Sequence, residues 1–173
     1  MGLAKVQNWT AKKSPVDTKV VELADVKHHS RDALLVLGGC HTLAMAEDQL
    51  VGDPIEKQAF AGIGFKHDGR LTSSSADGAV KIKKLKGFLF ESALKRQSSI
   101  VQISGAGRSN SLRVVCKGAP EVVEHFLAKV PDGYKEHYIG FVKDGARVLT
   151  LAFKDLGMSE GEAKAMTRPE AEQ

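Results

Sequence analysis

A lysine stands at the start of a short turn in KGAPE, residues 117–121. Pro120 suits the first position of a helix, because its fixed φ is already helical and its missing N–H would have no partner there. The proline therefore predicts a helix that begins at Pro120. The apolar residues that precede Lys117 predict a strand that ends near it. A long cation at the end of an apolar strand points either into water or toward a ligand.

Other side chains could serve one flat, electron-rich ligand with an anionic tail. Phe90 offers an aromatic face for a base, and base stacking contributes about 1–3 kcal/mol. Lys95, Lys117 and Arg147 could donate charge-assisted hydrogen bonds to phosphate or ribose oxygens. Glu56 could accept a hydrogen bond from an exocyclic amine. Each residue also has an ordinary interpretation: a core phenylalanine, solvated surface cations and, for Glu56, the carboxylate of a capping box.

Two helices are predicted upstream of Phe90. Apolar residues recur at three- and four-residue spacings over 28–48, which favours a helix, although two adjacent glycines weaken the pattern. A second helix is predicted over 53–66. Its start is indicated by Asp53 as N-cap, Pro54 at the first helical position and Glu56 at the third, where a capping box places its carboxylate.

Strands and further helices are predicted in the rest of the chain. Residues 79–90 have the pattern of an extended segment, and SSIVQIS and SLRVVCK predict a hairpin of strands 99–104 and 112–117. Two amphipathic helices and a strand follow, at 120–130, 134–145 and 146–154. This order of elements predicts an α+β fold with an antiparallel sheet.

Composition indicates a folded, globular protein. The chain has 173 residues, enough for one domain with one sizeable core. Apolar residues at 42% and charged residues at 27% are ordinary values, and no apolar run reaches the roughly 20 residues that cross a bilayer. We expect a soluble monomer. Cys40 and Cys116 lack CxxC spacing and are expected to be buried, reduced thiols.

The formal net charge of +4 raises the question of a nucleic-acid partner. Only KIKKLK, Lys81 to Lys86, is a dense basic run, because the other cations are interspersed with acids. Its ordinary interpretation is the solvated face of a strand or of a sheet edge, and lysines on an edge oppose edge-to-edge pairing. A basic nucleic-acid-binding domain that uses Lys81 to Lys86 stays open as the alternative function.

Several kinds of enzyme site are missing from the sequence. There is no GxxxxGK[ST] loop, and the glycines of GAGRSN fit a hairpin turn. The six histidines adopt neither HExxH nor a spacing typical of zinc. Cys40 and His41 are neighbours whose side chains would diverge on a helix, which argues against a nucleophile–base pair. We therefore predict neither catalytic nor metal-ligating residues in this chain.

Four segments, taken in order, resemble the nucleotide-binding domain of P-type ATPases. They are GDPIEKQAF, FESALKRQSSI, KGAPE and GARVLTLAFK, at 52–60, 90–100, 117–121 and 145–154. With VLGGCHTLAM, the set is most similar to the fifth class, the eukaryotic endoplasmic-reticulum branch associated with removing mistargeted transmembrane helices. The resemblance implies a twisted antiparallel sheet of six or seven strands flanked by helices.

The resemblance also implies which residues bind ATP. Phe90 would stack on adenine, and Lys95 and Gln97 would line the pocket beside it. Lys117, followed by Gly118, would reach ATP from the end of its strand. This would answer the question that the KGAPE lysine raises.

Three further positions complete the implied site. Glu56 would lie near the adenine amino group, with Asp53 close by. Arg147, at the opening of its strand, would reach toward the ribose and phosphates. Mg²⁺ would arrive on the nucleotide, so no metal site is implied within the chain.

The resemblance divides the chain into three parts. Residues 1–27, in which VDTKVVEL offers a short strand, would be a lead-in from the phosphorylation domain. Residues 28–158 would be the nucleotide-binding domain. Residues 159–173 would be a polar segment that returns toward the phosphorylation domain, and we expect its end to fray.

The resemblance finally implies the role of the parent protein. The domain would present ATP to an aspartate in a DKTGT motif, which this chain lacks, so the chain alone would bind nucleotide without turning it over. The parent would be an ATP-hydrolysing translocase at the cytosolic face of the endoplasmic reticulum membrane, either a membrane-helix dislocase or a cation-class transporter. Its phosphorylation and actuator domains would be the partners, with no nucleic acid.

Overall fold

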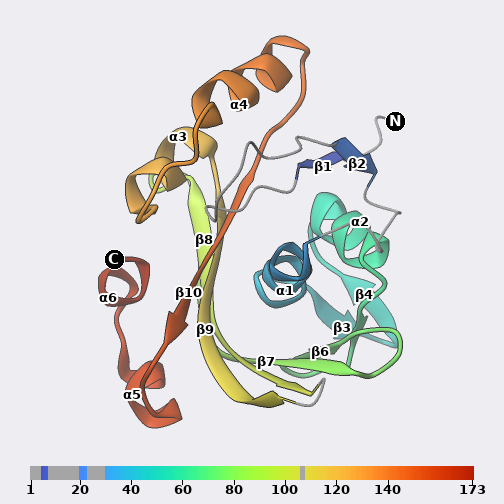
Figure 1. Ribbon diagram of the computed structural model, residues 1–173. Helices are drawn as coiled ribbons and strands as arrows, with labels where there is room; N and C mark the ends of the chain where they lie inside the picture. Colours follow the sequence, from blue (N-terminus) through green and yellow to red (C-terminus); the bar gives the residue numbers. More distant parts are fainter. Residues whose placement is uncertain (1–4, 8–19, 23–29, 106–107) are drawn as a thin grey trace.

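The computed structural model describes residues 5–7, 20–22, 30–105 and 108–173 (Figure 1). Most of the predicted lead-in lies outside these residues. Within it, β1 (Lys5–Gln7) pairs antiparallel with β2 (Val20–Glu22), which falls in the predicted VDTKVVEL strand. None of the helices in the described part is long and apolar enough to cross a membrane.

A six-stranded antiparallel sheet forms the centre of the fold, in the order β10-β9-β8-β7-β6-β5. Its strands are β5 (Lys66–His67), β6 (Thr72–Ser74), β7 (Val80–Glu91), β8 (Arg96–Gly105), β9 (Arg108–Gly118) and β10 (Thr150–Leu156). The predicted α+β class and antiparallel sheet are confirmed. The last strand begins later than predicted, at Thr150, which leaves Arg147 in the segment before it.

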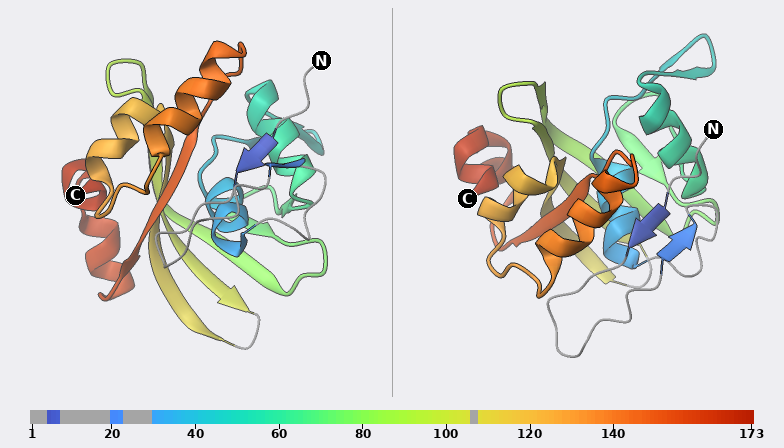
Figure 2. Two further views of the ribbon diagram at one scale, coloured as in Figure 1. Left: turned by 45° about the horizontal axis from the view of Figure 1, so that its top comes forward. Right: turned by 90° about the horizontal axis from the view of Figure 1, so that it is seen from above.

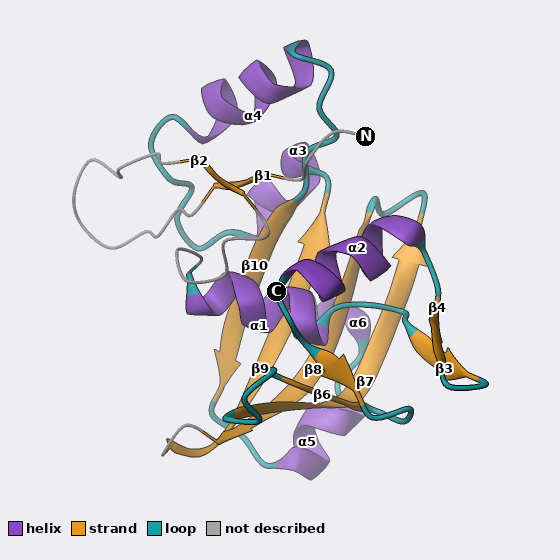
Figure 3. Ribbon diagram, turned by 90° about the vertical axis from the view of Figure 1, so that its right-hand side faces the viewer, coloured by secondary structure: helices purple, strands orange, loops and turns teal. Residues whose placement is uncertain are grey.

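Helices cover both faces of the sheet (Figures 1 and 2). One face, called here the α1 face, carries α1 (Arg31–Gly39) with α2 (Pro54–Gly62) beside it. The opposite face, called the α6 face, carries α5 (Glu160–Ala165) and α6 (Arg168–Glu172). Between β9 and β10 the chain forms α3 (Pro120–Val123), the 3₁₀ turn η2 (Glu124–Phe126) and α4 (Tyr134–Lys143), and α4 extends past the end of the sheet (Figure 3).

Each face of the sheet has its own hydrophobic core. The core on the α1 face is formed by Leu35, Val36, Cys40, Ile82, Val101, Ile103 and Val115. The core on the α6 face is formed by Ile100, Val114, Ala163 and Ala171. The glycine pair in α1 allows the close approach to the sheet, because a Cβ at Gly38 would lie 3.1 Å from Ile82 Cδ1 and a Cβ at Gly39 would lie 3.1 Å from Val101 Cγ1.

The long strand β7 bends at two β-bulges, where its register with β8 shifts between Lys84 and Lys86 and again between Phe88 and Glu91. A bulge places two residues opposite one and bends the strand. The sheet accordingly curves around α1 (Figure 1).

The predicted helix over 28–48 is wrong after residue 39. Its first two residues lie outside the described part, and α1 ends at the glycine pair, whose low helix propensity favours termination there. The following residues form a hairpin of β3 (Ala44–Ala46) and β4 (Gln49–Val51). Glu47 and Asp48 make its turn with φ of 48° and 60°, values typical of a tight two-residue hairpin connection.

Two other helices are shorter than predicted. The helix over 53–66 ends at Gly62, and Gly64 then turns the chain into β5 with a φ of 68°. The helix over 120–130 continues only through α3 and η2, and Leu127 is extended. The helix predicted over 134–145 is confirmed as α4, with Gly145 in the left-handed region directly after it.

The expectation that the end of residues 159–173 frays is wrong, because α6 is helical through Glu172. Capping boxes start α5 at Ser159 with Glu162 and α6 at Thr167 with Glu170. Both helices also bury a small residue against the sheet, as the α6-face core shows. The polar residues of this segment therefore cap helices instead of indicating a loose end.

The basic run is not on an edge strand, because β7 pairs with β8 on one side and β6 on the other. Lys84 donates to the carbonyl of His41 on the α1 face. Lys86 donates to the carbonyls of Lys164 and Met166 at 3.1 and 2.7 Å on the α6 face. The sheet thus separates Lys84 from Lys86, and the lysines of this run do not all lie on one face.

Candidate functional site

Lys117 meets Glu56 on the α1 face of the sheet. The ammonium Nζ pairs with Oε1 of the carboxylate, and the two side chains are only 14% and 9% exposed. Strand β9 positions the lysine one residue before its end, and the first turn of α2 positions the glutamate. The lysine of KGAPE therefore points toward a buried partner and not into water.

Thr42 holds the other oxygen of Glu56. Its backbone N–H and its hydroxyl donate to Oε2 at 2.9 and 2.8 Å. Burial alone would raise the pKa of Glu56, but the hydrogen bond and charge of Lys117, with the bonds from Thr42, hold that pKa below its ordinary value. Glu56 is therefore an anion at neutral pH.

Asp53 caps α2 as predicted, since its Oδ1 accepts from the N–H groups of Ile55 and Glu56 at 2.9 and 3.1 Å. The predicted capping-box role of Glu56 is wrong, because its two oxygens are used by Thr42 and Lys117. The helix start thus releases the Glu56 carboxylate to face the sheet.

The sheet register places Phe90 and Lys117 in one row. Gln97 is the cross-strand partner of Lys117, and Leu151 partners Lys117 from the other side. The second bulge of β7 puts both Leu89 and Phe90 opposite Gln97, because Phe88 pairs with Ser98 and Glu91 with Arg96. Cross-strand partners share a face, so the bulge residues, called here the Phe90 bulge, belong to the α1 face.

The spacing of this row suits a ligand the size of a purine. Phe90 and Lys117 stand two strands apart, which corresponds to about 10 Å between backbones. Phe90 is 54% exposed, so its interpretation as a core phenylalanine is wrong. Gln97, between them, is buried. An exposed ring, a buried amide and a cation therefore follow one another across β7, β8 and β9.

Two further groups complete the electrostatics of the site. Lys84 lies in the electrostatic surroundings of Glu56 and Lys117, and burial lowers the pKa of its ammonium. The Cys40 thiol donates to the backbone carbonyl of Gln97 at 3.4 Å, and burial raises its pKa to about 11. With two lysines against one carboxylate, the site favours an anionic ligand. The protonated thiol is a poor nucleophile at neutral pH.

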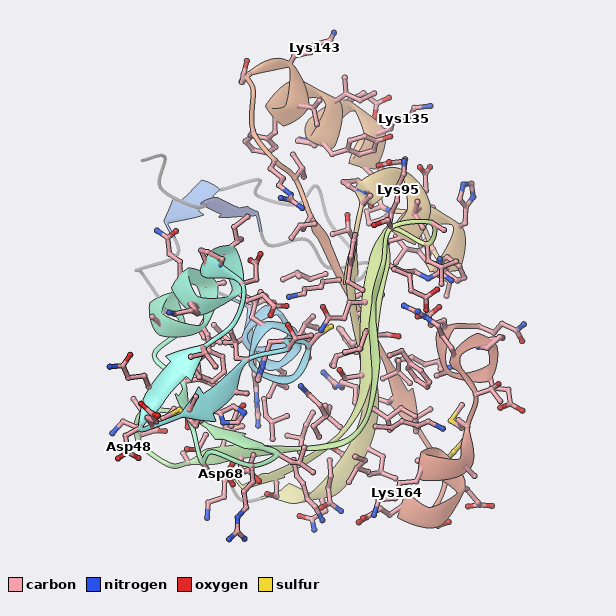
Figure 4. All side chains as sticks on the ribbon, turned by 180° about the vertical axis from the view of Figure 1, so that it is seen from behind. Asp48, Asp68, Lys95, Lys135, Lys143 and Lys164 are labelled. Carbon is pink, nitrogen blue, oxygen red and sulfur yellow. The ribbon has the colours of Figure 1, made fainter. Side chains whose placement is uncertain are left out.

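Lys95 and Gly118 connect the KGAPE turn to the β7–β8 hairpin. Lys95 sits in the hairpin turn with a φ of 46°, projects at the end of the sheet (Figure 4) and forms a 3.2 Å ion pair with Glu121. Its carbonyl accepts from the N–H of Ala119 at 3.0 Å. A Cβ at Gly118 would lie 2.6 Å from Arg96 Cβ and 2.9 Å from the Lys95 carbonyl, so only glycine allows this approach.

Arg147 is not brought into the group by the structure. It is exposed, in the segment between α4 and β10. Within the described part of the chain, no hydrogen bond or ion pair joins it to the other candidate residues.

The structure adds residues that the sequence reasoning missed. Thr42 carries no motif, and its role depends on the turn that follows α1. Lys84 belongs to a basic run, and the sequence does not show that it lies on the α1 face while Lys86 lies on the α6 face. Among the residues that the structure describes, no group of three or more His, Cys, Asp and Glu is arranged to hold a metal ion.

A small cleft toward the other end of the sheet is a separate feature. It is lined by Arg31, Asp32, Leu35, Ile103, Gly105, Ser111 and Arg113. The guanidinium of Arg113 is already engaged there, by Asp32 at 2.6 Å and Asp155 at 2.7 Å. These ion pairs account for the charge of Arg113 without a ligand.

Comparisons with known proteins give a consistent set of relatives. The chain is 37% identical over 134 residues to an endoplasmic reticulum transmembrane helix translocase of Schizosaccharomyces pombe, and 37% identical over 141 residues to the protein of the same name in Saccharomyces cerevisiae. It is also 37% identical over 142 residues to a probable manganese-transporting ATPase of Arabidopsis thaliana. No protein-family model matches the chain.

These matches cover most of this chain but a small part of each relative. They include 72%, 80% and 80% of the chain, and 11%, 11% and 12% of the three relatives, respectively. The chain therefore corresponds to one segment of much longer proteins.

Proposed function

The chain belongs to the P-type ATPases of the fifth class and corresponds to one segment of them. We propose that this segment is their nucleotide-binding domain. The observation that carries the proposal is the row of Phe90, Gln97 and Lys117 on one face of the sheet, with Glu56 against the lysine. These side chains come from three consecutive strands and from a helix that precedes them in the sequence.

Each member of the row has a task in the proposed complex with ATP. The exposed ring of Phe90 stacks on adenine, with Gln97 and Lys95 beside it. Lys117 reaches the nucleotide from the end of β9, and Gly118 keeps the KGAPE turn close to the hairpin. Two lysines near one carboxylate support binding of an anion, and Mg²⁺ would be carried by the phosphates.

Glu56 is proposed to share its carboxylate between the protein and the ligand. Its Oε1 already accepts from Lys117, and an exocyclic adenine amine would approach the same side. Asp53 contributes by starting the helix that presents Glu56. Arg147 would reach the ribose and phosphates only if the segment before β10 brings it toward the row.

The proposed domain comprises residues 28–158. The contacts of α5 and α6 with the sheet support counting 159–173 in the same folded unit, before the chain returns to a phosphorylation domain. Residues 1–27 would enter from that domain.

The activity of the whole protein is part of the proposal, because the chain spans about a ninth of its fungal relatives. The parent would hydrolyse ATP at the cytosolic face of the endoplasmic reticulum membrane, to move membrane helices or cations. Its phosphorylation and actuator domains would be partners within the same chain. This segment lacks the DKTGT aspartate, so alone it would bind ATP without hydrolysing it.

Binding by the isolated chain should be weak. One stacked base and a few partly exposed charges must offset several kcal/mol of lost translational and rotational freedom, so we expect a dissociation constant of roughly 0.1 mM to several mM. To contact the ligand, Lys117 must also share or exchange its bond to Glu56, which reduces the net free energy gained on binding.

Titration calorimetry with Mg-ATP tests the proposal. Phe90→Ala should weaken binding by about 1–3 kcal/mol, because it removes the stacking ring. Phe153→Ala is the matched control, since it removes another exposed ring of the sheet, on β10. Binding that is absent at tens of millimolar ATP, or equally weakened by both substitutions, would refute the proposed site.

A further inference from the structure

We propose that Arg168 of α6 is a positioning residue for the nucleotide site, because it holds the Phe90 bulge from the opposite face of the sheet. The inference rests on the proposed function and names a residue on which that site depends. Arg168 does not touch the proposed ligand. It acts through the backbone that carries Phe90.

One guanidinium contacts both strands of the β7–β8 hairpin at the bulge. Nη2 of Arg168 donates to the carbonyl of Leu89 at 3.1 Å and to the carbonyl of Arg96 at 3.0 Å. Nη1 pairs with the carboxylate of Glu91. The residues before and after Phe90 and the facing strand are therefore tied to one side chain, which is only 13% exposed.

The bulge supplies the physical need for this contact. An extra residue in β7 interrupts the ladder, so backbone groups at this point lose their regular partners. A buried or half-buried carbonyl without a donor costs free energy. The charge-assisted bond from Arg168 to the carbonyl of Leu89 provides the donor that a regular ladder would have supplied.

The face of Phe90 depends on the bulge. Phe88 packs in the α6-face core, and Glu91 reaches Arg168 on that same face. Leu89 would face α1 by plain alternation, and the extra residue between Phe88 and Glu91 brings Phe90 to the α1 face as well. A shift of register by one residue moves a side chain to the opposite face. Loss of the Arg168 contacts would thus make the Phe90 side chain more mobile on the α1 face or turn it to the α6 face.

A buried network fixes Arg168 itself. Its Nε donates to Glu172 at 3.0 Å, and the Glu172 side chain is 3% exposed. Arg96 also binds this carboxylate, at 2.7 Å, and Ser98 donates to it at 2.5 Å. Arg96 in turn lies 4.4 Å from the ring centre of Phe126. The C-terminal helix, the hairpin and η2 are therefore connected at the back of the proposed site.

The first measurement uses the 173-residue chain without nucleotide. Amide hydrogen exchange over residues 88–97 should accelerate at least about tenfold in Arg168→Met, because local opening of the hairpin loses charge-assisted bonds. Arg168→Lys keeps the charge but not the fork of donors, and should be intermediate. Lys154→Met is the control, since Lys154 ties α6 to β10 through the carbonyls of Glu170 and Gln173 without touching the hairpin.

The second measurement is Mg-ATP affinity in a double-mutant cycle. Arg168→Met should weaken binding at least about fivefold, within the range of the stacking contribution. In a Phe90→Ala background the same substitution should have no further effect, because it acts through Phe90.

The outcomes separate the two proposals. Absence of Mg-ATP binding by the wild type refutes the proposed function. The hydrogen-exchange experiment still tests whether Arg168 stabilises the β7–β8 hairpin. Unchanged hairpin exchange and unchanged affinity in both Arg168 variants overturn the inference. So does an equal loss of affinity with and without Phe90, because that result would assign Arg168 a different role. If Arg168→Met does not fold, Arg168→Lys carries both measurements.

Discussion

Replacing Lys117 with methionine should destabilise the fold in a way that depends on pH. In the structure the lysine neutralises one oxygen of Glu56, and Thr42 binds the other. Methionine keeps most of the apolar stem of lysine and removes only the charge. The variant therefore leaves the Glu56 carboxylate in place, buried and with half of its partners.

The size of the effect follows from burial. Removing one partner of a fully buried ion pair costs about 3–5 kcal/mol. Here the bonds from Thr42 remain and both side chains keep some contact with water, so we expect about 2 kcal/mol at pH 7.

The sign of the pH dependence is set by Glu56. Its pKa in the folded wild type is lowered from 4.5, so its ionised form stabilises the fold above that pH and the contribution is lost as pH falls through the lowered pKa. In the variant the hydrogen bond and charge of Lys117 no longer oppose the effect of burial, which raises this pKa. The variant can therefore protonate Glu56 at higher pH than the wild type, and the difference in stability between the two proteins should shrink as pH falls from the pKa of Glu56 in the variant to its lowered pKa in the wild type.

Urea unfolding at pH 7 and at acidic pH measures both effects. The double variant Lys117→Met with Glu56→Gln should recover much of the loss at pH 7, because position 56 then no longer carries a buried charge without Lys117. Lys154→Met serves as a control for the loss of a lysine that is not paired with Glu56. A loss below about 0.5 kcal/mol at pH 7, or a loss of the same size at every pH, would refute the reasoning.

Three further predictions concern the scaffold of the site. Burial lowers the pKa of His41 from 6.5 to about 3, so on acidification the unfolded chain binds a proton before the folded one. The free energy of unfolding should therefore fall by about 2 kcal/mol from pH 7 to pH 5. His41→Asn should remove this contribution to the pH dependence of stability, measured by urea unfolding. Gly118→Ala should lower stability by about 1–3 kcal/mol in thermal unfolding, because its Cβ would overlap the hairpin; an unchanged melting temperature would contradict this packing. Glu172→Gln should cost about 3 kcal/mol, because it leaves the Arg96 and Arg168 guanidinium groups without their shared anion; a loss no larger than that of the exposed control Glu136→Gln would argue against the network.

The central strands could be predicted from the sequence because their patterns are local. Residues 79–90, 99–104 and 112–117 alternate or run apolar between turn signals, and each matches a strand of the sheet, the first to within one residue at its start. The N-cap at Asp53 and the first helical position of Pro120 were likewise predictable, since each depends on the geometry of one helix start.

Other features depend on contacts between distant segments. The apolar spacing over 28–48 did not distinguish a continued helix from the β3–β4 hairpin, since the turn at Glu47 and Asp48 lacks the usual glycine. Glu56 has the position of a capping-box acid, and only the fold brings Lys117 close enough to bind it.

The presentation of Phe90 could not be predicted from β-strand alternation. Plain alternation from Phe88 would place Phe90 on the α6 face, because residues two apart share a face. The extra residue at the bulge moves it to the α1 face, and the contacts from Arg168 come from a segment more than 70 residues away in sequence. The polar composition of that segment did not indicate its packing role.

The central claim is that Phe90 and Lys117 line one face that accepts adenine. Intermolecular nuclear Overhauser effects in the chain saturated with Mg-ATP test it most directly. We predict cross-peaks from the adenine H2 and H8 protons to the Phe90 ring and to the side chain of Lys117. Cross-peaks to Phe88 on the opposite face, or an adenine that contacts neither Phe90 nor Lys117 in a saturated complex, would contradict the account.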